Sequence, residues 1–213
     1  MAQFKNADGK IVLLNLVKAI QENKAYLGEV DGLIGDGDHG MNMNKGFSIF
    51  KDRYQDLEFS FAEGLDDLGT ILLTEIGGSM GPIYGTIFMD AAEAGEDLDE
   101  ISAKDLGEML KAGLEGLYGI VDARVGDKTL VDTLAPVVDY LLDEDKAEVE
   151  YVDILTKMEE IAATGRDSTK LLMAKFGRSA RLGERSVGVL DAGATSCCII
   201  LTAMAEGIKE VLS

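Results

Sequence analysis

Apolar residues recur every three or four positions along most of this chain, and this helical period constrains the fold more than any other feature. The 213 residues include only two prolines and no Asn-Gly hairpin signal. Ser102 and Pro82 are typical of helix starts. We therefore predict an all-α, single-domain protein spanning residues 1–213. The expected helices cover residues 10–28, 42–54, 60–76, 82–94, 102–123, 130–143, 147–176 with a break near Gly165, and 193–212.

The connections between these helices fall into two classes. Those after the second, fourth and sixth helices are short and charged: "KDRYQDLEF", "AGEDLDEIS" and "DEDKAEVE". Those after the first, third, fifth and seventh are rich in glycine and hold unusual polar residues: "DGLIGDGDHG", "GGSMG", "RVGDKT" and "GRSARLGERSVGVLDAG". In an up-and-down bundle every second connection lies at the same end. The four glycine-rich loops are thus predicted to build one site at one rim.

The strongly acidic charge of the chain argues against some classes of binding partner. The chain has 20 Lys+Arg against 39 Asp+Glu, a formal net charge of −19. Nucleic acid and anionic membranes depend on basic patches, so we expect neither as a partner. Adjacent Cys197 and Cys198 form a poor disulfide pair. No signal peptide and no run of 18 apolar residues is present, so we expect a cytoplasmic protein.

The first loop, "GDGDHG" at residues 35–40, matches the G-x-G-x-x-G pattern of dinucleotide-binding folds. That pattern requires a preceding strand, whereas the preceding segment has a helical period. An EF-hand starting at Asp36 fails as well, because Gly40, Met41 and Phe47 occupy three of its required positions. Two interpretations remain open: an acidic turn that caps a helix, or a site where aspartates hold Mg²⁺.

In the metal interpretation, Asp31, Asp36 and Asp38 supply hard oxygen ligands, and phosphate oxygens complete the shell. The amides of His39, Gly40 and Met41, with the Asn42 side chain, then face the phosphates at a helix start. His39 is the one histidine of the chain.

The other three loops are also consistent with anion binding. Gly77, Gly78 and Ser79 precede a helix start, where free amides suit an anion, although a tight turn explains them equally well. Lys128 could pair with Asp127 or with a phosphate, or lie in a solvated turn. An arginine cluster suits phosphate recognition or transition-state charge, or salt bridges to the surplus acids; it comprises Arg178, Arg181 and Arg185. Phosphoryl transfer fits best, because it needs no protein nucleophile.

Four motifs, "GDGDHGMNM", "GGSMGPIYGT", "GDKTLVDTLAPV" and "GRSARLGERSVGVLDAGATS", resemble in order and spacing the signatures of the L subunit family of dihydroxyacetone kinases. The resemblance extends from about residue 6 to the C-terminus. It implies a closed barrel of eight antiparallel helices with ADP or ATP at one rim. It also implies that Asp31, Asp36 and Asp38 bind two Mg²⁺ ions that bridge the nucleotide phosphates.

The resemblance further assigns residues around the nucleotide. It implies that His39, Asn42, Ser79 and Met80 line the phosphates, with Gly40, Met41 and Gly78 beside them. Leu130, Arg178 and the Asp191, Ala192 and Gly193 stretch would surround the rest of the nucleotide. Arg178 and His39 are the candidate catalytic residues.

The resemblance also implies partners. In this family dihydroxyacetone is held by a separate K subunit, and a phosphohistidine-carrying M subunit of the phosphotransferase system recharges bound ADP. Two alternatives stay open: a regulatory module that docks on a transcription regulator, and a kinase subunit for another small acceptor. The chain departs from the family pattern at Ser79-Met80, where Ala-Ser is usual, at Ala192, where proline is usual, and at Val189, where histidine is frequent.

Overall fold

The computed structural model describes residues 2–143 and 149–213, and these residues are mostly helical. The α-helices are α1 (Gly9–Glu22), α2 (Lys24–Ile34), α3 (His39–Tyr54), α4 (Phe61–Glu75), α5 (Met80–Gly95), α6 (Ala103–Ile120), α7 (Val131–Leu142), α8 (Tyr151–Ser168) and α9 (Ala192–Leu212). Short 3₁₀ segments are η1 (Asn6–Asp8), η3 (Thr169–Leu171) and η4 (Ser179–Ser186), and two short strands are β1 (Phe4–Lys5) and β2 (Glu100–Ile101).

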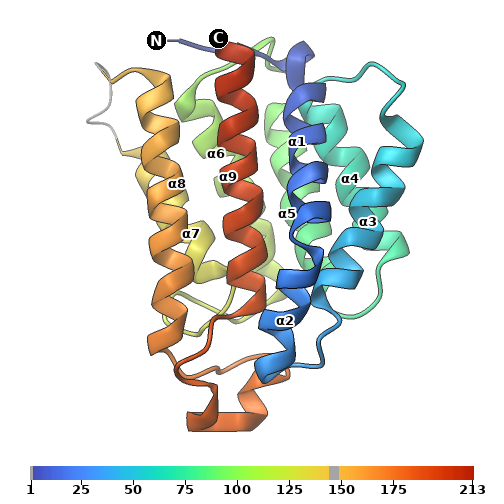
Figure 1. Ribbon diagram of the computed structural model, residues 1–213. Coiled ribbons are helices and arrows are strands. Elements are labelled where there is room, and N and C mark those ends of the chain that lie inside the picture. Colours follow the sequence, from blue (N-terminus) through green and yellow to red (C-terminus); the bar gives the residue numbers. More distant parts are fainter. Residues whose placement is uncertain (1, 144–148) are drawn as a thin grey trace.

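The helices form a closed ring. They pack on their neighbours in the order α1, α3, α4, α5, α6, α7, α8 and α9, and α9 completes the ring against α1 (Figure 1). Apolar side chains fill the interior, among them Phe47, Leu68 and Leu117, each with no measurable exposure. The predicted all-α barrel of antiparallel helices is therefore confirmed. Because the helices alternate in direction, the links α2–α3, α4–α5, α6–α7 and α8–α9 lie at one end, as predicted.

Several expected helix boundaries were wrong. The expected helix over residues 10–28 is two helices, since the chain turns at Asn23 and continues as α2 to Ile34. The helix expected from residue 42 begins at His39. The expected break near Gly165 is absent: α8 runs through it, because a glycine there lets α8 approach the Asp132 carbonyl of α7. That helix ends at Ser168 rather than residue 176, and residues 147 and 148 of the expected span lie outside the described residues.

Capping chemistry sets two of the helix starts. Ser60 and Glu63 form a reciprocal capping box at α4, and Ser102 and Asp105 form another at α6, which confirms Ser102 as an N-cap. Both lie at the end of the barrel opposite the glycine-rich links. Helices α4 and α5 approach closely because Gly69 and Gly85 face each other; a Cβ on Gly69 would lie 3.0 Å from the Gly85 carbonyl oxygen.

The N-terminal segment closes the end of the barrel opposite the glycine-rich links. Phe4 pairs with Ile101 in the short β1–β2 ladder, which the sequence pattern did not predict. The buried Asn6 side chain donates to the carbonyls of Gly95 and Leu98 and accepts from the Ala62 amide. Such fully paired buried amides are costly to break, at about 1–3 kcal/mol for each group left unpaired. In the described part of the chain, no helix has the length and apolarity to cross a membrane.

Candidate functional site

A cavity of about 620 Å³ opens at the end of the barrel where the four glycine-rich links meet. Side chains and backbone from all four links line it, which confirms that these loops converge. A second pocket, of about 720 Å³, lies near the opposite end and is lined by carboxylates such as Glu63, Asp90 and Glu96. It contains none of the residues predicted for a site, so the first cavity is the candidate.

Three carboxylates gather on one side of this cavity. Asp31 lies in the last turn of α2, and Asp36 and Asp38 follow in the link to α3. One oxygen from each lies within 4.8 Å of the others. Gly35 makes this possible, since a Cβ there would lie 2.2 Å from Oδ1 of Asp31. Gly37 adopts a left-handed conformation, with φ of 77°, which turns the chain toward α3.

This donor set fits a divalent cation. Three carboxylates in close proximity repel one another unless a positive charge lies between them, and hard oxygen ligands are those that Mg²⁺ prefers. Asp38 is the N-cap residue of α3, yet its side chain makes no capping hydrogen bond. Its carboxylate is therefore not committed to the helix start.

His39 is the first residue of α3 and lies beside this acidic group. Its backbone N–H donates to Oδ2 of Asp31 at 3.3 Å, and its ring Nε2 lies 2.8 Å from Oγ of Ser196 on α9. Burial lowers the pKa of His39 to about 4, against the opposing attraction of Asp31. The ring is consequently neutral at pH 7.

The second link provides a helix start at the cavity. Gly78 has a left-handed φ of 76°, and the exposed Ser79 is the N-cap residue of α5 without a side-chain capping bond. The first N–H groups of α5 have no intrahelical acceptor, as at any helix start, so they are available to an anion. Pro82 falls at the third residue of α5, because the helix begins at Met80 rather than at residue 82.

Lys128 corrects a prediction about the third link. It pairs with neither Asp127 nor an open anion site: its buried ammonium donates to the carbonyls of Thr169 and Val189. Its backbone is left-handed, with φ of 62°, and this conformation directs the side chain inward. Asp127 instead binds Lys175 at 2.5 Å, and that hydrogen bond lowers the pKa of Asp127. Lys128 thereby joins both ends of the long link between α8 and α9.

The same long link carries Arg178 to the acidic group. The guanidinium of Arg178 forms an ion pair with the carboxylate of Asp36, and both residues line the cavity. Arg181 and Arg185, which the sequence groups with it, are exposed and do not line the cavity. The arginine cluster thus contributes one residue to the site rather than three.

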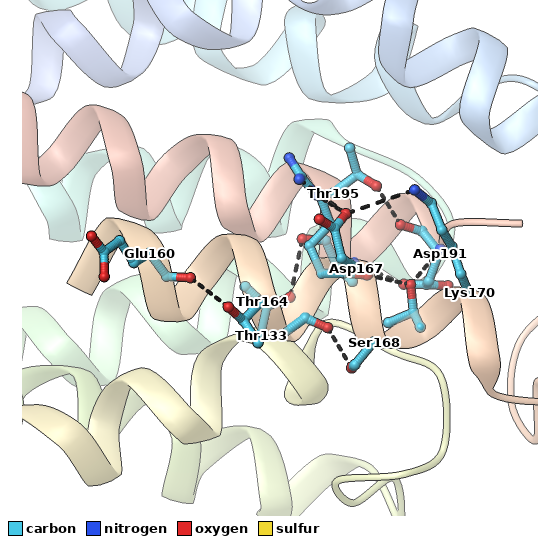
Figure 2. Close-up of polar contacts among 12 residues, drawn as sticks. Thr133, Glu160, Thr164, Asp167, Ser168, Lys170, Asp191 and Thr195 are labelled. Atoms are coloured by element: carbon cyan, nitrogen blue, oxygen red, sulfur yellow. Dashed lines mark hydrogen bonds and ion pairs between the residues drawn. The ribbon is translucent and has the colours of Figure 1, made fainter. Parts of the chain in front are cut away.

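Asp191 acts as the N-cap of α9. Its Oδ2 accepts from the Ala194 amide at 2.7 Å, and its own amide donates to Oγ1 of Thr169 at 3.1 Å. Figure 2 shows Asp191 and Thr195 at the start of α9, beside the end of α8 at Asp167 and Ser168. Burial raises the pKa of Asp191 to about 6. The main role of this carboxylate in the structure is thus to cap α9 and fix the backbone of the cavity wall.

Most of the predicted site residues meet in the cavity. Its lining includes Asp31, Asp36, Asp38, His39, Asn42, Gly78, Ser79, Met80, Leu130, Arg178, Asp191, Ala192 and Gly193. Gly40 and Met41 are not part of the lining. Gly40 is buried between α2 and α3, where a Cβ would lie 2.0 Å from the Lys24 carbonyl oxygen, and the Met41 side chain is 58% exposed.

Sequence reasoning missed Tyr84 and Ser196. The Tyr84 hydroxyl lies 2.6 Å from Oγ of Ser196, which in turn contacts His39. Tyr84 follows Met80 by one helical turn, and Ser196 follows Gly193 by one turn. Each therefore lies on the same face of its helix as a predicted site residue. That spacing was the available signal.

Comparison with known proteins identifies relatives over most of the chain. Residues 33–206 match the DAK2 domain family. The chain is 36% identical over 188 residues to the PEP-dependent dihydroxyacetone kinase 1, ADP-binding subunit DhaL, of Listeria innocua, covering 88% of this chain and 89% of that one. It is also 36% identical to the PEP-dependent dihydroxyacetone kinase, ADP-binding subunit DhaL, of Escherichia coli, covering 87% of this chain and 89% of that one.

A solved structure has the same fold. It is the dihydroxyacetone kinase from C. freundii in complex with AMP-PNP and Mg²⁺, with a TM-score of 0.72 and 21% sequence identity. The match covers 97% of this chain and 35% of that longer chain. The fold of this chain therefore corresponds to about a third of that kinase.

Proposed function

The chain belongs to the DAK2 domain family, and from that premise we propose that it is the nucleotide-binding subunit of a dihydroxyacetone kinase, with ADP or ATP and Mg²⁺ in the cavity at the glycine-rich end of the barrel. Residues 1–213 would form one domain, consistent with the closed ring of helices. The observation that carries the proposal is the group of three carboxylates within 4.8 Å, which lies beside the start of α3 in the cavity that the start of α5 also lines.

Each part of this cavity suits a part of Mg²⁺-nucleotide. Asp31, Asp36 and Asp38 would hold two Mg²⁺ ions. The ions supply charge neutralisation for the phosphates. The free amides at the start of α5, with Ser79, suit phosphate oxygens, and Asn42 offers a further donor from α3. Arg178 would provide a positive charge for the transferred phosphoryl group.

The proposed reaction needs two protein partners. A phosphohistidine on an M subunit gives its phosphoryl group to ADP, and the resulting ATP phosphorylates a hydroxyl of dihydroxyacetone on a K subunit, yielding dihydroxyacetone phosphate and restoring ADP. Both transfers require the partner to reach the nucleotide directly. The partners must therefore bind at the open end of the barrel.

Exposed apolar side chains at this end support such docking. Leu33 of α2 is 67% exposed and Leu171 is 83% exposed. Others at the same end are Met41, Leu73, Val125, Met173, Phe176 and Val187, all exposed. They come from the segments that flank the four glycine-rich links, so they surround the cavity. Apolar contacts of this kind are typical of the core of a protein–protein interface, and they leave the polar cavity enclosed between the subunits.

The metal assignment is tested with Asp36→Asn, which removes one negative charge but retains the size of the side chain. We expect the affinity for Mg²⁺-ADP, measured by isothermal titration calorimetry, to fall at least about tenfold, because one charged ligand is lost. Asp52→Asn is the matched control, since Asp52 is exposed near the far end of α3. Equal affinity in both variants would show that the acidic group does not hold the metal.

The assignment as a kinase subunit is tested by reconstitution. Dihydroxyacetone phosphate should form when this chain is combined with K and M subunits and phosphoenolpyruvate-derived phosphohistidine, and omission of any one subunit should abolish it. Product formation without this chain, or none with all three present, would contradict the proposal. If the chain serves a kinase for another small acceptor, a phosphorylated product should form only when the K subunit is replaced by a subunit that binds that acceptor.

A further inference from the structure

The ring of His39 is connected to two buried hydroxyls. Its Nε2 lies 2.8 Å from Oγ of Ser196, which lies 2.6 Å from the Tyr84 hydroxyl. Both hydroxyls also lie near the carbonyl oxygen of Gly193, at 3.1 Å from Ser196 and 3.2 Å from Tyr84. Ser196 has no measurable exposure and Tyr84 is 3% exposed. The network joins the start of α3 to α5 and α9.

The network has few donor hydrogens, and this number limits which of its contacts can be hydrogen bonds at the same time. Two hydroxyl oxygens 2.6 Å apart require a hydrogen between them, donated by either Tyr84 or Ser196. The Gly193 carbonyl can only accept, and each hydroxyl has one hydrogen to donate. Above the ordinary histidine pKa of about 6.5, an imidazole ring is neutral, and it either donates from Nε2 or accepts there, depending on its tautomer.

The Nε2–H tautomer satisfies more of the contacts. If Tyr84 donates to Ser196, then Ser196 donates to Gly193 and His39 donates to Ser196. If Ser196 donates to Tyr84, then Tyr84 donates to Gly193 and His39 again donates to Ser196. Either way, three of the four contacts are hydrogen bonds. With Nε2 unprotonated, Ser196 must donate to His39 and Tyr84 to Ser196, so only two contacts are bonded and Gly193 receives neither hydroxyl.

We propose that Ser196 is a positioning residue that holds the His39 ring as the Nε2–H tautomer, so that unprotonated Nδ1 is the ring nitrogen available to a ligand. His39 lines the cavity whereas Ser196 does not, so the Nε2 edge is turned into the protein. An unprotonated Nδ1 accepts a hydrogen bond, and therefore binds a water or a ligand hydroxyl rather than an anionic phosphate oxygen.

The tautomer assignment is independent of the proposed function, but its effect on ligand binding rests on that function. If Mg²⁺-nucleotide occupies the cavity, the phosphates are left to the backbone amides, to Ser79 and to Asn42. The His39 ring then interacts with a hydroxyl or a water beside them. This is a narrower role than lining the phosphates, the role that the sequence resemblance implies.

The tautomer can be measured directly because the chain contains one histidine. In the ¹⁵N-labelled, nucleotide-free full chain at pH 7.5, a long-range ¹H–¹⁵N correlation spectrum should show one imidazole, with Nε2 protonated and Nδ1 unprotonated. Ser196→Ala should move the two nitrogen signals toward each other, as the tautomer ratio changes by about fivefold on loss of one net hydrogen bond.

Tyr84→Phe is the matched variant. It removes a hydroxyl from the same network but leaves Ser196 to accept from His39 and to donate to Gly193, so the wild-type pattern should persist. A protonated Nδ1 in the wild type, an unchanged spectrum for Ser196→Ala with native circular dichroism, or a switched tautomer in Tyr84→Phe would each overturn the inference.

The experiment also separates this inference from the proposed function. The spectrum is recorded without nucleotide, whereas Mg²⁺-ADP binding is measured by calorimetry on the same sample. The expected spectrum without Mg²⁺-ADP binding would contradict the function and leave the tautomer assignment standing. Binding with a protonated Nδ1 would contradict the tautomer assignment alone.

Discussion

Arg178 and Asp36 form an ion pair that joins the link between α8 and α9 to the acidic group at the start of α3. Asp36 is also a member of the carboxylate triad. Under the proposed function, the same carboxylate would have two competing partners, a guanidinium and a divalent cation. Both groups are partly solvent-exposed, at 64% for the Arg178 side chain and 36% for that of Asp36, so the pair is weak enough to exchange.

Arg178→Ala should consequently affect cation binding and phosphoryl transfer in opposite directions. An exposed ion pair contributes at most about 1 kcal/mol, so affinity for Mg²⁺ alone should rise up to about fivefold in calorimetry. Activity in the reconstituted kinase should fall about 10³-fold or more, if Arg178 stabilises transferred charge. Arg185→Ala, exposed in the same segment, controls for net charge. Weaker Mg²⁺ binding in Arg178→Ala would rule out competition for Asp36.

Lys128→Met should loosen the long link. The buried ammonium donates to the carbonyls of Thr169 and Val189, and hydrogen bonds from charged groups contribute about 1.5–3 kcal/mol. We expect the free energy of unfolding in urea to fall by about that amount, and amide hydrogen exchange to increase over residues 169–191. Lys104→Met, at an exposed position of α6, should change neither. Faster exchange spread evenly over the barrel would show a global rather than a local effect.

Asp191 should make stability depend on pH. Its pKa is raised from 3.8 to about 6 by burial, so the folded state binds the proton more tightly than the unfolded state. The contribution of this group to stability is thus present below pH 3.8 and is lost as pH rises through 6.

Asp191→Asn keeps an oxygen that can cap α9 but cannot ionise. We expect its melting temperature, relative to that of the wild type, to be about 5–10 °C higher at pH 7.5 than at pH 4. Asp52→Asn, at an exposed site, should show the same difference from the wild type at both pH values. A larger increase in the melting temperature of Asp191→Asn over the wild type at pH 4 than at pH 7.5 would contradict a raised pKa for Asp191.

Gly40→Ala should destabilise the protein, because a Cβ would lie 2.0 Å from the Lys24 carbonyl oxygen and 2.8 Å from the Gly28 amide nitrogen. Separating α2 from α3 should cost about 1–3 kcal/mol of unfolding free energy. Gly119→Ala is the control: apart from its chain neighbours and the backbone of α6 itself, no atom lies within 4 Å of its Cβ position, so stability should stay equal or rise by up to about 1 kcal/mol. Equal stability of both variants would contradict close α2–α3 packing.

The helical period and the alternation of bland and glycine-rich links were sufficient to predict an all-α up-and-down bundle with the four glycine-rich links at one end, whereas the closed barrel was implied by the family resemblance. Period and direction are local properties, so they can be read without knowing which residues meet. The exact boundaries were less predictable. Asn23 and Gly165 show why: one breaks a helix that periodicity continues, and the other stays helical because α7 packs against it.

The sequence by itself determined the acidic character of one side of the cavity, since Asp31, Asp36 and Asp38 lie within eight residues and short loops leave them little freedom. Only the tertiary structure decided the partners of Lys128, Arg178 and His39. Each pairs with residues from a distant segment, at Thr169 and Val189, at Asp36 and at Ser196. Such pairings follow from closure of the helix ring, which brings α9 and the long link beside α2 and α3. No local pattern encodes that geometry, because it results from the packing of the whole core.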